Sequence, residues 1–196
     1  MELNKAYRLL NHGPTTLITS AHNGNRNIMA AAWVCALDFD PPKVTVVIDK
    51  NTYTRELIEA SGTFAINLPC VAQIDLVQQL GNSSGRDLAD TDKFAMHNLT
   101  TFDAKNIDVP LLAGCVAWLE CKIIPEPHNQ NSYDLFIAEV VAAYADERVF
   151  GDGRWHFESQ GSVGDDQSTL DKLRTIHHVA GGAFFATGKA LQAGQD

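Results

Sequence analysis

Residues 49–55, DKNTYTR, combine two hydroxyl side chains and two positive charges at a point where a helix is expected to begin. Thr52 and Thr54 supply the hydroxyls, and Lys50 and Arg55 supply the charges. A helix N-terminus offers free backbone N–H groups and the positive end of the helix dipole, so this segment could bind a phosphate. It also suits an ordinary helix start, in which one threonine is the N-cap and an acidic residue follows in the first turn. Both interpretations remain open on this segment alone.

Three successive alanines, Ala30, Ala31 and Ala32, lie within residues 27–36, which otherwise have the composition of a strand. Alanine is depleted in strands, so the run needs a reason. Small side chains allow a close approach to the backbone, which a planar ring needs if it is to accept hydrogen bonds from main-chain N–H groups. Tight packing of the strand against a helix explains the alanines as well, and alone they favour that explanation.

The segment GNSSGRD at residues 81–87 is a flexible loop that carries one arginine, Arg86. Such a loop could close over an anionic ligand, although a solvated loop is the default interpretation. The chain has neither the Gly-x-x-x-x-Gly-Lys-Ser/Thr pattern nor the Gly-x-Gly-x-x-Gly pattern, so a P-loop and a Rossmann dinucleotide site are not supported.

Two adjacent histidines, His177 and His178, precede a pair of glycines near the C-terminus. No two histidines have the His-x-x-x-His spacing of a helical metal site, and no metal is expected. His178 is the better candidate for contact with a substrate or cofactor, and His177 is expected to be a polar surface residue. The chain also lacks a Gly-x-Ser-x-Gly nucleophile elbow and a recognisable pair of nucleophile and base. Any difficult chemistry therefore belongs to a cofactor.

The chain as a whole, with 196 residues and a formal net charge of −9, has the length of one domain. We expect a single domain over residues 1–196, with a C-terminal extension from about 160 to 196. The negative charge argues against nucleic-acid binding, which needs a basic face. No apolar run is long enough for a membrane helix and no signal peptide precedes the domain, so a cytoplasmic protein is expected. The four cysteines lack Cys-x-x-Cys spacing and are expected to be reduced and buried.

The expected fold class is mainly β, a β-barrel with flanking helices. Helices are expected over residues 54–60 and 71–80. Strands are expected over residues 15–21, 27–36, 44–48, 64–68, 116–124, 133–145 and about 154–158. Strands and helices do not alternate regularly, which excludes a doubly wound α/β fold. A closed or partly closed antiparallel barrel would protect this many strand edges.

Several short segments, in their order and spacing, resemble the flavin reductase-like family of FMN-binding split β-barrels, in particular its flavoredoxin-like branch. The resemblance spans roughly residues 13–188. The matching segments are GPTTLITS at 13–20, NIMAAAW at 27–33, DPPKV at 40–44, YTRELI at 53–58, SGTFAINL at 61–68, SGRD at 84–87 and HVAGG at 178–182. Each is weak alone, and together they make the resemblance fairly specific.

The resemblance implies an antiparallel Greek-key split barrel that binds FMN, rather than FAD, near the interface of a homodimer. It also implies electron transfer through the flavin, with NADH or NADPH as the donor. His178 would lie near the open flavin face as the catalytic residue. The cofactor-binding residues implied are Asn27, Met29, Ala30, Ala31, Ala32, Lys50, Asn51, Tyr53, Thr54, Arg55, Ala65, Asn67, Ser84, Gly85 and Arg86. Arg86 would reach the phosphate from its loop, in the same subunit or from the other.

One departure from the family pattern bears on affinity. Many relatives read Met-Thr-Ala-Ser-Trp where this chain reads Met29-Ala30-Ala31-Ala32-Trp33. Backbone contacts to a flavin survive this change, but two hydroxyls are lost. One neutral hydrogen bond contributes about 1 kcal/mol, so each loss would weaken binding about fivefold.

Three functions are compatible with these observations. The leading hypothesis is an FMN-binding oxidoreductase of the NAD(P)H:flavin reductase type. The second is a flavoredoxin-type electron carrier, in which bound FMN passes electrons to a protein redox partner. The third is a split barrel without flavin that serves as a binding or dimerisation module.

Overall fold

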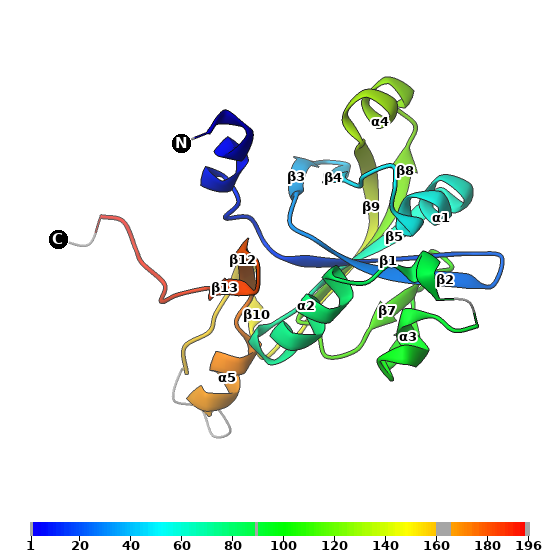
Figure 1. Cartoon of the computed structure of the whole chain (residues 1–196). Coiled ribbons are helices and arrows are strands. Elements are labelled where there is room, and N and C mark those ends of the chain that lie inside the picture. The colour runs from blue at the N-terminus through cyan, green and yellow to red at the C-terminus, as the bar shows by residue number, and fades with distance from the viewer. Residues whose placement is uncertain (1, 89, 160–165, 195–196) are drawn as a thin grey trace.

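A computed structural model describes residues 2–88, 90–159 and 166–194 of the chain (Figure 1). Its main element is a seven-stranded sheet with the order β2-β1-β5-β8-β9-β4-β3, in which every neighbouring pair is antiparallel. The strands are β1 (Thr16–His22), β2 (Asn25–Ala31), β3 (Val34–Phe39), β4 (Pro42–Val47), β5 (Thr63–Leu68), β8 (Ala117–Ile124) and β9 (Leu135–Ala145).

The sheet is rolled into an incomplete barrel. Strands β2 and β3 lie at opposite ends of the strand order, yet only Ala32 and Trp33 separate them in the chain. Ala31 of β2 and Val34 of β3 pack into the same apolar core, beside Phe64 and Phe136. The two edges of the sheet must therefore approach each other, which gives a split barrel. The expectation of a mainly β, antiparallel fold with flanking helices is confirmed.

Strand β1 is buried on both faces. Successive side chains of a strand point to opposite sides. Ile18 therefore packs into the barrel core, while Leu17 packs into a second apolar cluster outside it. That second cluster includes Val77 and Leu80 of helix α2 (Ile74–Gly81). Helix α2 thus covers the outer side of the β1–β2 hairpin (Figure 1).

Helix α1 (Tyr53–Ser61) buries Leu57 and Ile58, and Ile58 belongs to the barrel core. Both ends of this helix agree with the residues that the sequence predicts for a helix start and a helix end. The Thr52 hydroxyl accepts a hydrogen bond from the backbone N–H of Arg55 at 3.3 Å, and Gly62 ends the helix with φ +72°. Glycine adopts this left-handed conformation without the steric cost that other residues incur.

The remaining elements are short. The other helices are α3 (Lys93–Met96), α4 (Pro127–Tyr133) and α5 (Gln167–Leu173), with 3-10 turns η1 (Leu3–Leu9), η2 (Val71–Gln73) and η3 (Gly85–Asp87). Three hairpins pair β6 (Thr101–Asp103) with β7 (Pro110–Leu112), β10 (Phe150–Gly151) with β11 (Arg154–Trp155), and β12 (Ile176–Ala180) with β13 (Ala183–Ala186). None of the helices in the described part of the chain has the length and apolar character to span a bilayer.

Four local expectations differ from the structure. Residues 27–36 form the ends of two strands, because the chain crosses from one barrel edge to the other at Ala32 and Trp33. Residues 71–73 form a 3-10 turn before α2, and Tyr133 ends helix α4 rather than beginning β9. Cys35 is exposed, whereas the other three cysteines are buried, and all four are free. Part of the expected C-terminal extension, residues 160–165, lies outside the described residues.

Candidate functional site

Two cavities lie along strand β2 and share Ala30 and Gly81 in their walls. The first, here called the neutral cavity, has a volume of about 370 Å³ and is lined by Thr15, Ala30, Ala31, Ala32, Val77, Gln78, Gly81, Asn82, His178, Gly181 and Phe184. The second, here called the polar cavity, has a volume of about 230 Å³ and is lined by Asn27, Met29, Ala30, Asn51, Thr52, Tyr53, Thr54, Leu80, Gly81, Ser83, Ser84, Gly85 and Lys93. The two cavities adjoin at these residues beside the C-terminal end of α2, and both together are here called the groove along β2.

The floor of the polar cavity is Asn27, which is 3% exposed. Its amide nitrogen donates to the Thr54 hydroxyl at 2.9 Å. Its amide oxygen is buried and has no hydrogen-bond partner among the described residues. Buried polar atoms are nearly always hydrogen-bonded, so an oxygen of this kind suggests a ligand donor.

Gly85 closes the polar cavity by a close approach that only glycine permits. A Cβ atom at this position would lie 2.3 Å from the Asn27 amide oxygen and 3.1 Å from Cδ1 of Tyr53. Any larger residue would push the loop away from β2 and α1. The glycine therefore brings the loop against the floor of the cavity.

Lys93 supplies the charge of the polar cavity, and the sequence analysis missed it. The side chain is 1% exposed, and its ammonium group donates to the carbonyls of Leu80 at 2.9 Å and of Ser83 at 2.6 Å. It forms no ion pair within the described residues. Burial lowers the pKa of Lys93 to about 8. The feature of the sequence that could have indicated the burial of Lys93 is its position between Asp92, the N-cap of α3, and Phe94, which is buried.

The Lys93 ammonium group can still donate a hydrogen bond to a ligand. An ammonium group has three donors, and the two carbonyls use two of them. Removal of a charge from water is costly unless an opposite charge compensates it. An anion in the polar cavity would supply that compensation.

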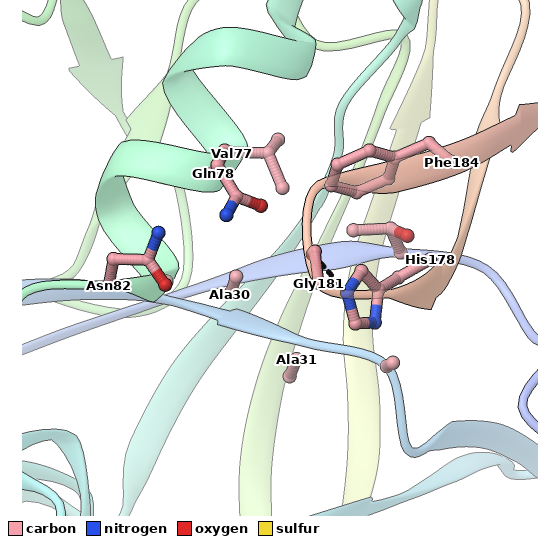
Figure 2. A pocket seen from close by; sticks show the side chains of 11 residues that line it. Ala30, Ala31, Val77, Gln78, Asn82, His178, Gly181 and Phe184 are labelled. Atoms are coloured by element: carbon pink, nitrogen blue, oxygen red, sulfur yellow. Dashed lines mark hydrogen bonds between the residues drawn. The ribbon is translucent and has the colours of Figure 1, made fainter. Parts of the chain in front are cut away.

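The neutral cavity has a different character, because its lining includes no aspartate, glutamate, lysine or arginine within the described residues. Figure 2 shows Gln78 and Asn82 on α2, Ala30 and Ala31 on β2, and the β12–β13 hairpin with His178 and Phe184 on the other side. The Thr15 hydroxyl, on a residue that also lines this cavity, is buried and lacks a partner among the described residues.

His178 is held in a defined orientation. Its Nε2 lies 2.9 Å from the carbonyl oxygen of Gly181 (Figure 2), and its ring meets Phe184 edge-on at 5.3 Å between ring centres. A carbonyl can only accept, so Nε2 carries a proton, and in the neutral form of the ring Nδ1 is the acceptor. The histidine thus brings one hydrogen-bond acceptor to an otherwise apolar edge of the cavity.

A clamp made by residues 11–13 joins the C-terminal hairpin to the end of β2. The Asn11 amide donates to the carbonyl of His178 at 3.2 Å and accepts from the indole N–H of Trp33 at 3.2 Å. His177, expected to be a polar surface residue, places Nδ1 2.8 Å from the carbonyl of His12 and Nε2 3.1 Å from the Thr187 hydroxyl. These contacts hold the β12–β13 hairpin, which carries His178 and Phe184, beside the end of β2.

Most of the expected site residues line the groove, but Arg55 does not. Its guanidinium group is buried on the other side of α1, where it bonds Glu59 at 2.5 Å and Asp134 at 3.0 Å. It also donates to the backbone carbonyls of Ile48 and Gln130, both at 2.9 Å, and lies over the ring of Phe136 at 4.5 Å. This side chain supports the packing of α1 and α4 against the sheet.

Four more expected residues lie outside the two linings: Lys50, Ala65, Asn67 and Arg86. Lys50 is exposed, and Ala65 is fully buried in the sheet. Asn67 is also fully buried, where its amide bonds Leu17, Thr19 and Leu112. Arg86 forms an ion pair with Glu56 of α1 at the surface. Asn51 does line the polar cavity, although its amide nitrogen bonds the Asp49 carboxylate at 2.9 Å.

Other lining residues were not anticipated. Thr15, Gln78, Asn82 and Phe184 face the neutral cavity in addition to the expected alanines and His178. Gln78 and Asn82 are four residues apart, so they lie on the same face of α2. Their position could be inferred only with knowledge of how α2 crosses β2.

The chain is similar to a known protein family and to solved structures. The model of the flavin reductase like domain matches residues 8–163. A solved FMN-binding domain of a flavin reductases-like enzyme from Shewanella baltica OS155 is 50% identical, with a TM-score of 0.83, over 98% of this chain and 95% of that chain. The flavoredoxin of Desulfovibrio vulgaris (Miyazaki F) is 25% identical, with a TM-score of 0.74, over 93% and 90%.

Among curated proteins, the Escherichia coli (strain K12) protein YddH is 44% identical over 99% of this chain and 97% of its own length. The family match covers well over half of the chain, and the similarity to the Shewanella baltica domain extends over nearly all of it. The resemblance inferred from the short segments is confirmed, and the chain belongs to the flavin reductase-like family of FMN-binding split barrels.

Proposed function

We propose that this protein holds FMN in the groove along β2 and transfers electrons through it, with NADH or NADPH as the donor. The observation that carries the proposal is that a neutral cavity adjoins a polar cavity whose buried lysine has no ion-pair partner among the described residues. An elongated ligand with an uncharged planar ring and a terminal phosphate fits this polarity from end to end. FMN has that form, and the fold is that of an FMN-binding family.

At the polar end, the phosphate would lie beside Lys93, with the hydroxyl of Ser84 and the backbone N–H groups at the start of α1 as further donors. The unpartnered Asn27 oxygen would accept from a hydroxyl of the ribityl chain. The phosphate would balance the charge of Lys93, for which the described part of the chain supplies no opposite charge.

At the neutral end, the small side chains of Ala30, Ala31 and Ala32 would let the ring approach the backbone of β2. Gln78 and Asn82 would offer amide hydrogen bonds from above the strand. The bound flavin would supply the redox chemistry by taking a hydride from the nicotinamide. The tasks of the chain's own residues are to orient the ring, exclude water and fix the donor on the open side.

His178 is proposed to contact the nicotinamide donor. Gly181 fixes its tautomer and Phe184 its ring plane, so Nδ1 is available to accept an N–H from the donor. His178→Ala should raise KM for the donor about fivefold, the effect of one lost hydrogen bond, and leave the FMN Kd unchanged. Gln130→Ala, on the distant α4, is the matched control. Equal loss of FMN affinity and donor affinity would instead assign His178 to the flavin.

The first test is the visible absorption spectrum of the purified protein, before and after addition of FMN and gel filtration. Retained flavin absorbance, followed by oxidation of NADH or NADPH in stopped-flow mixing, would support the proposal. A protein that remains colourless and shows no quenching of FMN fluorescence would favour the flavin-free binding module.

A second candidate function is an electron carrier to a protein partner. The similarity to a flavoredoxin favours it, as does a curated relative called high molecular weight rubredoxin, 32% identical over 71% of this chain and 58% of its own length. The reductase is favoured by similarity to a 4-nitrophenol monooxygenase reductase component from Rhodococcus opacus, 27% identical over 66% and 64%. Rapid turnover of the nicotinamide with free flavin as acceptor would support the reductase, whereas slow turnover would support the carrier.

The homodimer implied by the family remains part of the proposal. An apolar groove between β3, β4, β8 and β9, lined in part by Val44, Leu119 and Val140 at the edge of the barrel core, would be covered by the second subunit. The mass in solution, measured by light scattering, tests this assembly. The cytoplasmic location likewise remains a proposal, which cell fractionation would test.

A further inference from the structure

Two successive threonines at the start of β1 have hydroxyl groups in different surroundings. Thr15 and Thr16 are both buried, at 4% and 1% exposed. The Thr16 hydroxyl donates to the carbonyl of Ala31 at 2.9 Å. The Thr15 hydroxyl has no hydrogen-bond partner among the described residues, although the backbone N–H of Thr15 donates to the carbonyl of Ile176 at 2.9 Å. The backbone of Thr15 is therefore held in place, while its hydroxyl can still form hydrogen bonds.

The Thr15 side chain is part of the wall of the neutral cavity. Thr16 and Ala31 lie opposite each other on β1 and β2, so Thr15 and Ala32 follow one residue beyond this pair on the two chain segments. Ala32 lines the same cavity. A Cβ atom at Gly13 would lie 3.4 Å from the carbonyl oxygen of Ala32, so the segment before β1 stays close to the end of β2. The unpartnered hydroxyl thus lies beside the alanine run.

A buried hydroxyl without a partner is an exception in folded proteins, because it has lost its hydrogen bonds to water. The other polar side chains of the neutral cavity come from different elements: Gln78 and Asn82 from α2, and His178 from the β12–β13 hairpin (Figure 2). Thr15 adds a polar group from the β1 side. A hydroxyl both donates and accepts, so it can pair with either kind of group on a ligand.

We propose that the Thr15 hydroxyl binds the polar edge of the flavin ring, which makes Thr15 a further cofactor-binding residue. The proposal rests on the proposed flavin site and deepens it. The polar edge of the ring carries carbonyl oxygens and an imide N–H, and a hydroxyl can pair with both. The alanine run would bring the ring against β2, and Thr15 lies next to that run. The cofactor would then supply the partner that the described part of the chain does not.

The test measures the affinity of the full chain for three flavins by fluorescence titration. FMN, riboflavin and lumiflavin share the ring, and lumiflavin lacks both the ribityl chain and the phosphate. Thr15→Val keeps the shape of the side chain and removes the hydroxyl, so all three flavins should bind about fivefold more weakly, the effect of one lost hydrogen bond. Thr15→Ser keeps the hydroxyl and should change each Kd less than about twofold. Thr63→Val, outside both cavity linings, is the matched control.

Urea unfolding of the full chain without flavin gives a second measurement, in which a ligand-binding hydroxyl and a structural one have opposite effects. Thr15→Val removes a buried hydroxyl that has no partner among the described residues, so the urea midpoint should stay the same or rise. Thr16→Val removes a hydroxyl that is bonded to Ala31, so its midpoint should fall. Thr15→Val should therefore lose flavin affinity without losing stability.

Three results would overturn the role of Thr15. Unchanged affinity for all three flavins in Thr15→Val would show that the hydroxyl does not contact the ring. A loss for FMN and riboflavin without a loss for lumiflavin would place the hydroxyl at the ribityl chain. A lower urea midpoint in Thr15→Val would show that the hydroxyl supports the fold. If the wild type binds none of the three flavins, the proposed function itself fails, and that failure is distinct from the other three.

Discussion

In the polar cavity the chain places a buried lysine without an ion-pair partner and a buried amide oxygen without a donor, both among the described residues. In the neutral cavity it places small apolar side chains, two amides and one histidine. The two cavities meet at Ala30 and Gly81. This difference implies that the two ends have different roles. The polar end would bind the cofactor through charge, and the neutral end would hold the ring without fixed charges near it. Changes at the first should alter binding, and changes at the second should alter turnover.

Arg55→Ala should produce the largest effect, and the effect should be on stability. The buried guanidinium pairs with the partly exposed carboxylates of Asp134 and Glu59, and its removal leaves two backbone carbonyls without this donor. Breaking a buried ion pair costs about 3–5 kcal/mol. Urea unfolding should show this loss in the free energy of unfolding, while the folded fraction binds FMN normally.

Arg154→Ala removes an exposed arginine from β11 and should change the free energy of unfolding by no more than about 0.5 kcal/mol. If Arg55→Ala instead retains full stability and loses FMN, the phosphate lies at Arg55, as the helix-start pattern suggested, and the polar cavity is assigned incorrectly.

Lys93→Met should have the next largest effect, this time on affinity. A hydrogen bond to a charged group contributes about 1.5–3 kcal/mol, so FMN should bind about a hundredfold more weakly. Riboflavin lacks the phosphate, and its Kd should hardly change. Lys50→Met removes the same charge from an exposed position near the groove and controls for long-range electrostatics. A parallel loss of riboflavin would show that the substitution damages the whole groove.

The pH dependence of FMN affinity tests the same residue without mutation. The pKa of Lys93 is lowered to about 8 by burial, and a bound phosphate dianion would raise it again. Binding would therefore take up a proton above pH 8. The affinity should be highest below about pH 8 and fall at higher pH, by at most about tenfold per pH unit. A Kd that stays constant between about pH 7 and pH 9.5, or an equal fall for riboflavin, would contradict the role of Lys93.

The contrast between Arg55 and Lys93 also shows how far the sequence could be interpreted. The helix at residues 53–61 and its threonine cap follow from local pattern, and the structure reproduces them. Which face of that helix meets a ligand depends on where α4 and β9 pack against it. That packing is tertiary structure, which the local sequence does not determine. Arg55 points toward Asp134, 79 residues away in the chain, and no local pattern contains that contact.

The role of Lys93 could not be predicted from the sequence, because it also depends on tertiary contacts. A lysine after a loop is usually solvated, and its burial depends on the end of α2 arriving above it with two free carbonyls. The alanine run was easier to interpret, because small side chains in a strand restrict the alternatives to close packing or close approach of a ligand. The structure shows close packing of Ala31 in the barrel core and a cavity beside the same residue, and a ligand in that cavity remains a proposal.

The smallest expected effect belongs to the neutral end. Ala32→Ser adds a hydroxyl to the lining of the neutral cavity, at the position where the family pattern described under the sequence analysis has a serine. If the ring lies against β2, one new hydrogen bond should tighten FMN and riboflavin alike by about fivefold, since it contributes about 1 kcal/mol. Fluorescence titration of both flavins measures this change, and Ala36→Ser, at an exposed position on β3, is the control. A gain for FMN without a gain for riboflavin would place the hydroxyl near the phosphate rather than the ring. An unchanged Kd for both would mean that position 32 does not contact the flavin, and that the alanine run serves the packing of the barrel.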